Sequence, residues 1–128
     1  MGPTRQKLTV QSHPKRGEIY LTALDPTVGQ EIQKTRPALV IQNDISNRVT
    51  NVTIVAPITS TVRFPLNPVH VLLTADQNTG LSVVSIALLN QVRAVDRSRL
   101  VKRLGKVDAR TLEQVDEAIR ISMGLKPL

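Results

Sequence analysis

The pattern of apolar and polar positions predicts strands over most of the first hundred residues. Apolar and polar side chains alternate over residues 18–24, as in a strand with one buried face. Residues 38–41 form a continuous apolar run, which is typical of a strand buried on both faces. Residues 52–58 alternate again, but Pro57 cannot donate to a neighbouring strand and therefore predicts an edge or a bulge. Further apolar runs predict a short and a long strand, at residues 69–73 and 83–95.

Helical patterns are confined to the end of the chain. Asp96 is a suitable N-cap for a short helix over residues 97–104, which Gly105 would end. Asp108 is a suitable cap for a longer helix that Gly124 would end, with apolar side chains at helical spacing at Leu112, Val115, Ile119 and Met123. Because strands come first and helices last, we expect a mainly β fold with C-terminal helices (α+β), built on a small antiparallel sheet or barrel.

The remaining segments are polar. Asp25-Pro26 opens a loop, and residues 43–51 are rich in Asn, Asp and Ser, as in a connection. Residues 1–14 lack the apolar centre of a secretory signal and are predicted to be a disordered extension, so that the domain spans residues 15–128. Since no apolar run reaches the length of a membrane span, we expect a cytoplasmic protein that is not inserted in a membrane.

Charge and composition narrow the possible partners. The 128 residues carry a formal net charge of +7, which attracts polyanions such as nucleic acid, an acidic protein segment or a membrane surface, or serves solubility alone. The absence of cysteine excludes disulfides and thiolate metal sites. With one Tyr, one Phe and no Trp, base stacking on aromatic rings is not expected to dominate a nucleic-acid contact. Composition alone therefore indicates a basic, mostly β domain.

The order of several short motifs takes the interpretation further. They are R-G-E-I-Y at residues 16–20, D-P-T-x-G-x-E at 25–31, K-T-R-P-A-L-V-I at 34–41 and P-I-T-S at 57–60. Together they resemble the MazF/PemK toxin family over residues 15 to about 124. The resemblance implies a small SH3-like or CcdB-like β-barrel and a homodimer. It also implies an endoribonuclease that cuts single-stranded mRNA at a short sequence without metal or other cofactor, restrained by an acidic MazE-like antitoxin.

Arg36 is the first candidate catalytic residue. The resemblance places the family's catalytic arginine in this Arg-Pro dipeptide. A residue that precedes proline is also pushed toward extended geometry, which would hold Arg36 stiffly at the entry to a buried strand. A guanidinium binds phosphate through two hydrogen bonds and stabilises the negative charge that builds up when the 2′-hydroxyl attacks phosphorus. The alternative is an ordinary surface arginine at a strand end.

Three more side chains complete the candidate catalytic region. Thr59 matches the family's catalytic threonine and could donate to a phosphate oxygen, or it could only satisfy its own backbone in a turn. Ser60 follows it as a candidate for substrate binding. Glu31 matches an acidic residue of relatives and could orient Arg36 or accept a proton, or it could be a solvated loop charge.

Candidates for reading the RNA lie further along the chain. Gln91 and Arg93 are two residues apart in the predicted long strand and would share one of its faces. The amide of Gln91 both donates and accepts, as a base edge requires, whereas Arg93 could hold a phosphate or lie at the rim of the barrel. Asn43 and Asn47 could contact bases, although turn formation is the commoner role of asparagine.

Other charged groups have simpler interpretations. His13 and His70 are not favoured as an acid–base pair, since one lies in the predicted extension and the other in a short strand. An acidic cluster on the last helix is interpreted as a solvated face rather than a metal site: Glu113, Asp116 and Glu117. A basic run could attract RNA or the antitoxin, or be solvated: Arg97, Arg99, Lys102, Arg103 and Lys106.

Two other functions fit the same fold. One is a non-enzymatic toxin that traps DNA gyrase, and the other is a DNA-binding regulatory module. A pure binding protein would need neither the Arg36-Pro37 dipeptide nor the motif at residues 57–60. These two motifs therefore favour the endoribonuclease.

Overall fold

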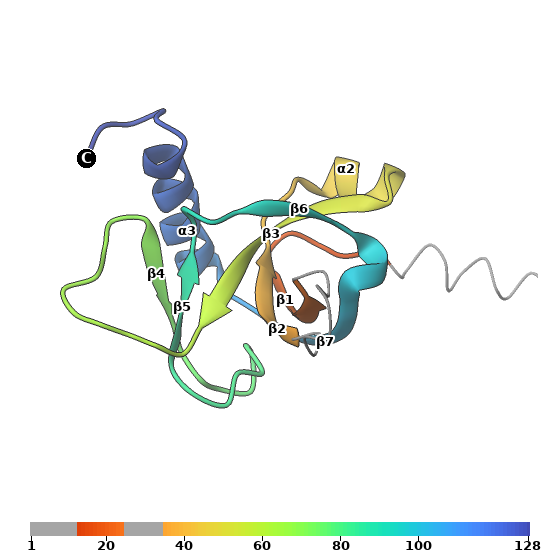
Figure 1. The fold of residues 1–128 in the computed structure, drawn as a ribbon, viewed down its shortest axis with the longest axis horizontal. Coiled ribbons are helices and arrows are strands. Elements are labelled where there is room, and N and C mark those ends of the chain that lie inside the picture. Colours follow the sequence, from red (N-terminus) through yellow and green to blue (C-terminus); the bar gives the residue numbers. More distant parts are fainter. Residues whose placement is uncertain (1–12, 25–34) are drawn as a thin grey trace, which may run out of the picture.

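The computed structural model describes residues 13–24 and 35–128 and contains mainly strands there. The strands are β1 (Glu18–Ala23), β2 (Thr35–Val40), β3 (Val52–Thr59), β4 (His70–Leu73), β5 (Ser85–Leu88), β6 (Arg93–Asp96) and β7 (Leu100–Lys106). The helices are α2 (Asp44–Val49), the 3-10 turn η1 (Arg97–Arg99) and α3 (Ala109–Ser122). The strands form one antiparallel sheet in the order β4-β5-β3-β2-β1-β7, with β6 also paired to β3 (Figure 1). The predicted antiparallel α+β fold is confirmed, with one C-terminal helix instead of two.

Strand β2 is the centre of the core. Ala38 and Val40 pack in one buried apolar cluster, with Val55 of β3. Leu39 points the other way, into a second cluster that includes Val115 of α3. All three β2 residues have no exposed surface, so the prediction that this run is buried on both faces is confirmed. This firm anchoring fixes the position of the exposed residues at the start of the strand.

The last helix begins and ends where its sequence predicts. The Asp108 carboxylate accepts the Thr111 N–H at 2.8 Å, and this hydrogen bond holds the pKa of Asp108 below its usual value. The helix buries Val115 and Ala118 against the sheet, on the side where β4 and β5 lie (Figure 1). Gly124 follows with φ 77°, a conformation that favours glycine.

The predicted long strand over residues 83–95 is wrong. It is two strands, β5 and β6, separated by a turn in which the Gln91 N–H donates to the Leu88 carbonyl at 3.1 Å. Strand β6 pairs with the beginning of β3 as far as Val55, and β5 pairs with its end from Ile58. Pro57 therefore lies within a central strand, not at an edge, at the point where β3 changes partner.

The predicted helix over residues 97–104 is also wrong beyond its first turn. Asp96 does act as a cap, since its carboxylate accepts the Ser98 N–H at 2.9 Å. From Leu100 the chain becomes β7 and pairs with β1. Leu100 and Leu104 are both half-buried, and their spacing of four suits one face of a strand as well as one face of a helix. Pairing with β1 decides between the two.

Two local patterns also differ from the prediction. The connection at residues 43–51 contains α2, which Asn43 caps by accepting the Ser46 N–H at 2.8 Å. In β1 the alternation is interrupted by irregular pairing with β7, so that Thr22 is fully buried and Leu21 only half-buried. Leu21 is thereby left partly open to the surface.

The predicted N-terminal boundary, at residue 15, lies close to the start of the described residues. Residues 1–12, most of the predicted extension, lie outside the described residues, and Pro14 is already buried. Within the part of the chain that the structure describes, no helix is both long and apolar enough to cross a membrane.

Candidate functional site

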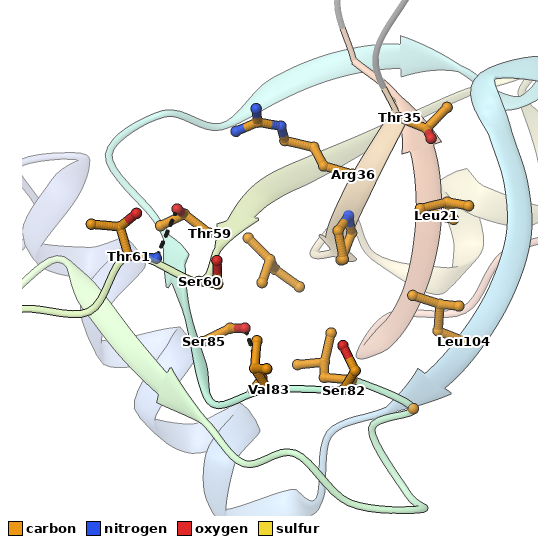
Figure 2. A pocket seen from close by; sticks show the side chains of 14 residues that line it. Leu21, Thr35, Arg36, Thr59, Ser60, Thr61, Ser82, Val83, Ser85 and Leu104 are labelled. Atoms are coloured by element: carbon orange, nitrogen blue, oxygen red, sulfur yellow. Dashed lines mark hydrogen bonds between the residues drawn. The ribbon is translucent and has the colours of Figure 1, made fainter.

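A groove of about 770 Å³ lies beside the end of β3, where the beginning of β2, the segment before β5 and β7 come together (Figure 2). Its lining comprises Leu21, Thr35, Arg36, Pro37, Ile58, Thr59, Ser60, Thr61, Gly80, Leu81, Ser82, Val83, Ser85 and Leu104. Among these described residues Arg36 alone carries a charge. The groove is therefore a mixed apolar and hydroxyl-rich surface with one cation.

Arg36 and Thr59 are brought together by the pairing of β2 with β3. Ala38 and Pro57 form the last pair between these strands at this end, and Arg36 and Thr59 each lie two residues beyond it. From there β2 continues beside Thr22 of β1 and β3 continues beside Ile86 of β5, so Arg36 and Thr59 border the same opening. Figure 2 shows both side chains on the groove, with the guanidinium extending toward the side where Thr59 lies. The guanidinium and the hydroxyl can thus contact one small ligand.

Arg36 combines a fixed backbone with an accessible head group. Its backbone pairs with Thr22 of β1, and the next residues are Pro37 and the fully buried Ala38. Its side chain is exposed, and no hydrogen bond or ion pair holds it within residues 13–24 and 35–128. Its N–H groups are therefore available to an anion such as phosphate.

The hydroxyl of Thr59 is oriented by the chain that follows it. Thr59 Oγ1 accepts the Thr61 N–H at 3.2 Å (Figure 2). This hydrogen bond uses an oxygen lone pair and leaves the hydroxyl hydrogen free to be donated to a ligand. The two interpretations of Thr59 are thus compatible, because the side chain satisfies its own backbone and also lines the groove. Ser60 is exposed beside it and lines the groove as well.

The opposite wall of the groove was missed by the sequence analysis. It is formed by residues 80–85, all of which except Val84 line the groove, and the Ser85 hydroxyl donates to the Val83 carbonyl at 2.9 Å. Gly80 has φ 71° and lies so close to β7 that a Cβ atom there would come within 2.0 Å of the Leu104 carbonyl oxygen. The one signal of this wall in the sequence is Gly80 itself.

The residues expected to read RNA lie outside the groove lining. Gln91 is exposed in the turn after β5, and Arg93 is exposed at the start of β6. The prediction that they share a face of one strand is wrong, because the turn separates them. Asn43 caps α2, as described above. Asn47 is fully buried and accepts hydrogen bonds from the Gln42 amide and the Thr53 hydroxyl, so it serves the fold.

Glu31 lies outside the described residues. The two histidines that are described, His13 and His70, do not line the groove. The acidic cluster of α3 is engaged in part in ion pairs, of Asp116 with Arg16 at 2.7 Å and of Glu117 with Arg120 at 3.2 Å.

The basic run is divided between η1 and β7. Arg99 donates to the Ala23 carbonyl at 3.0 Å, and Arg103 pairs with Glu18 at 2.7 Å. Burial, together with the Glu18 carboxylate, raises the pKa of Tyr20 to about 12, so that this phenol stays protonated near neutral pH. Within the described ranges, no three His, Cys, Asp or Glu side chains are grouped so that they could hold a metal ion.

Comparison with known proteins gives consistent results. The model of the "PemK-like, MazF-like toxin of type II toxin-antitoxin system" family matches residues 15–123. Endoribonuclease EndoA of Bacillus subtilis (strain 168) is 41% identical over 111 residues, which cover 87% of this chain and 95% of that protein. Endoribonuclease MazF of Staphylococcus saprophyticus is 36% identical over 111 residues, covering 87% and 92%. The crystal structure of MazE-MazF (Form-II) from Deinococcus radiodurans matches with a TM-score of 0.75 and 29% identity, covering 91% of this chain and 100% of that one.

Proposed function

Because this chain belongs to the PemK-like and MazF-like toxins of type II toxin–antitoxin systems, we propose that it is an endoribonuclease that cuts single-stranded RNA in the groove beside Arg36. The observation that carries the proposal is the common position of Arg36 and Thr59 on that groove. A cation and a hydroxyl donor that face the same space suit a phosphodiester. Two relatives that match this chain over most of its length are named endoribonucleases.

The proposed reaction is an attack by the RNA's own 2′-hydroxyl. The 2′-oxygen forms a bond to phosphorus while the bond to the 5′-oxygen of the next nucleotide breaks. The proton of the 2′-hydroxyl passes to a base, and the departing 5′-oxygen takes up a proton from water or from the protonated base. The products are a 2′,3′-cyclic phosphate and a 5′-hydroxyl. Glu31 remains our candidate for the group that accepts the proton.

Arg36 and Thr59 act on the charge that develops during this step. Negative charge accumulates on the oxygens bound to phosphorus, and two N–H groups of one guanidinium can bind two of them. The Thr59 hydroxyl, oriented by its hydrogen bond from Thr61, donates to a phosphate oxygen or positions the 2′-hydroxyl. Because the Thr59 hydroxyl is oriented before the reaction, it stabilises the transition state more than a mobile donor would.

Incubation of the pure protein with a long RNA in excess EDTA tests the proposed activity. We expect cleavage to continue, because the positive charge is supplied by Arg36 rather than by a metal ion. Fragments should carry 5′-hydroxyl ends, and a 2′-deoxy sugar at a mapped cut should prevent cleavage there. Intact RNA, with the Arg36→Ala variant behaving identically, would instead favour a toxin that acts by binding alone.

Replacing the Thr59 hydroxyl tests its contribution to RNA cleavage. Thr59→Val keeps the shape of the side chain but removes one hydrogen bond to a charged group, so we expect kcat/KM for RNA to fall about 10- to 100-fold. Thr59→Ser retains the hydroxyl and should keep most of the activity. Initial rates on one short RNA substrate give the comparison. Equal rates for Thr59→Val and the unmodified protein would remove Thr59 from the mechanism.

The proposal includes an antitoxin and a second copy of the chain. The related Deinococcus structure is a MazE-MazF complex, and the present chain carries a net charge of +7 that suits an acidic partner. We infer that a MazE-like antitoxin covers the groove of a homodimer and blocks Arg36. Adding the antitoxin should therefore stop RNA cleavage, and sedimentation of the free protein should give the mass of a dimer.

A further inference from the structure

The groove wall at residues 80–85 carries no charged side chain. Figure 2 shows Ser82 and Val83 across the groove from Arg36, with Thr59, Ser60 and Thr61 at one end between them. Because Arg36 is the one charged side chain among the described residues that line the groove, an anionic phosphate should lie at its side. The 80–85 wall suits an uncharged part of the same substrate.

The groove surface between Arg36 and the 80–85 wall is apolar, and more exposed lining residues carry hydroxyl groups. Leu21, Ile58 and Leu104 contribute aliphatic side chains that are buried or half-buried, whereas Ser60 and Ser82 are exposed. A nucleobase has the matching character, since its faces are apolar and its edges donate and accept hydrogen bonds. The volume of about 770 Å³ falls within the roughly 300–1,000 Å³ of pockets for small organic ligands. A phosphate alone would leave much of it empty.

The 80–85 wall is held by the loop that precedes it. The Asp76 carboxylate accepts the Asn78 and Thr79 N–H groups at 2.8 and 2.9 Å, and the Asp76 carbonyl accepts the Gly80 N–H at 2.9 Å. The Lys106 N–H donates to the Asn78 carbonyl at 2.8 Å, which ties the loop to β7. A wall fixed in this way can discriminate between ligands by shape.

We propose that Ser82 and Val83 form a subsite for the nucleobase next to the scissile phosphate and contribute to the choice of cleavage sequence. The inference rests on the proposed endoribonuclease function. Val83 is apolar, 52% exposed and part of the groove lining, so it can lie against a base face. The Ser82 hydroxyl can donate to or accept from the base edge.

The neighbouring Val84 provides a matched control. Val83 and Val84 are adjacent and similarly exposed, at 52% and 49%, but Val83 lines the groove and Val84 does not. We would compare Val83→Asp with Val84→Asp on short RNAs that carry each of the four bases on either side of a mapped cut. The two variants change the net charge equally and remove the same exposed side chain.

Val83→Asp should lower kcat/KM about tenfold or more, as loss of an apolar pocket contact does, and change the order of base preference at one flanking position. Val84→Asp should keep the unmodified order and rate. Val83→Ala, which adds no charge, should change the base preference in the same direction with a smaller loss of rate. Equal urea unfolding midpoints would show that all three variants are folded.

The outcomes separate the subsite from the function on which it rests. If the unmodified protein cuts RNA and Arg36→Ala does not, but Val83→Asp and Val84→Asp behave alike, the subsite is overturned and the endoribonuclease stands. An unchanged base preference in Val83→Ala would overturn the subsite as well. If the unmodified protein cuts none of the RNAs, and does not bind an RNA analogue that carries a 2′-deoxy sugar, both the subsite and the endoribonuclease function are overturned.

Discussion

Replacing Arg36 with alanine is expected to lower kcat for RNA cleavage by about 10²- to 10³-fold, as removal of one fixed transition-state donor does elsewhere. The side chain lies on the groove without a hydrogen bond or ion pair among the described residues, so the fold does not depend on its charge. The loss should fall mainly on kcat, because the extra negative charge exists only in the transition state. Single-turnover cleavage of one RNA substrate, with saturating enzyme, measures the chemical step.

Two further variants separate position from charge. Arg36→Lys keeps the positive charge but cannot form bidentate hydrogen bonds with a phosphate, so we expect a partial loss of activity. Arg110→Ala removes one exposed positive charge from α3, outside the groove lining, and should leave kcat unchanged. A fall in Arg110→Ala as large as that in Arg36→Ala would mean that overall positive charge, and not the guanidinium in the groove, governs cleavage.

Replacing Gly80 with alanine is expected to lower the free energy of unfolding by about 3–5 kcal/mol, combining backbone strain with overpacking. Its φ of 71° is strained for any side chain, and the added Cβ would meet the Leu104 carbonyl oxygen at 2.0 Å. Because the position of the Cβ is fixed by the backbone of residue 80, and the oxygen belongs to the backbone of Leu104, either the 80–85 wall or β7 has to move. RNA cleavage should therefore fall as well. Urea unfolding followed by circular dichroism measures the loss of stability.

Gly124 offers the matched control for this prediction. Its φ is 77°, but a Cβ there would have no atom within 4 Å. Gly124→Ala therefore carries the backbone strain alone, which costs about 1–2 kcal/mol. If the two variants lost the same stability, the close approach of Gly80 to β7 would contribute nothing to the fold.

Strong local patterns predicted some elements of this fold well. The apolar run of β2 and the capped, amphipathic α3 were found at their observed places, since burial on both faces and an Asp cap leave clear traces in sequence. The pairing of distant segments leaves a weaker trace. The turn at Gln91 and the β7 strand were both missed, because contacts with β3 and β1 determine them.

In the candidate site, too, residues in local motifs were predictable from the sequence, whereas those placed by distant contacts were not. Arg36 and Thr59 could be proposed from their motifs, and the pairing of Ala38 with Pro57 beside them explains how residues 23 positions apart face one groove. The 80–85 wall contains only glycine, serine and aliphatic residues, which carry no chemical signature. Its role depends on its approach to β7, which only the folded chain reveals.

A double-mutant cycle tests most directly whether Arg36 and Thr59 act on one phosphodiester. The single-turnover cleavage rates of Arg36→Ala, Thr59→Val and the double variant would be compared with that of the unmodified protein on one RNA. Groups that bind the same phosphate depend on each other, so we predict that the double variant cleaves about as slowly as Arg36→Ala alone. Independent, multiplying losses would contradict a shared phosphate.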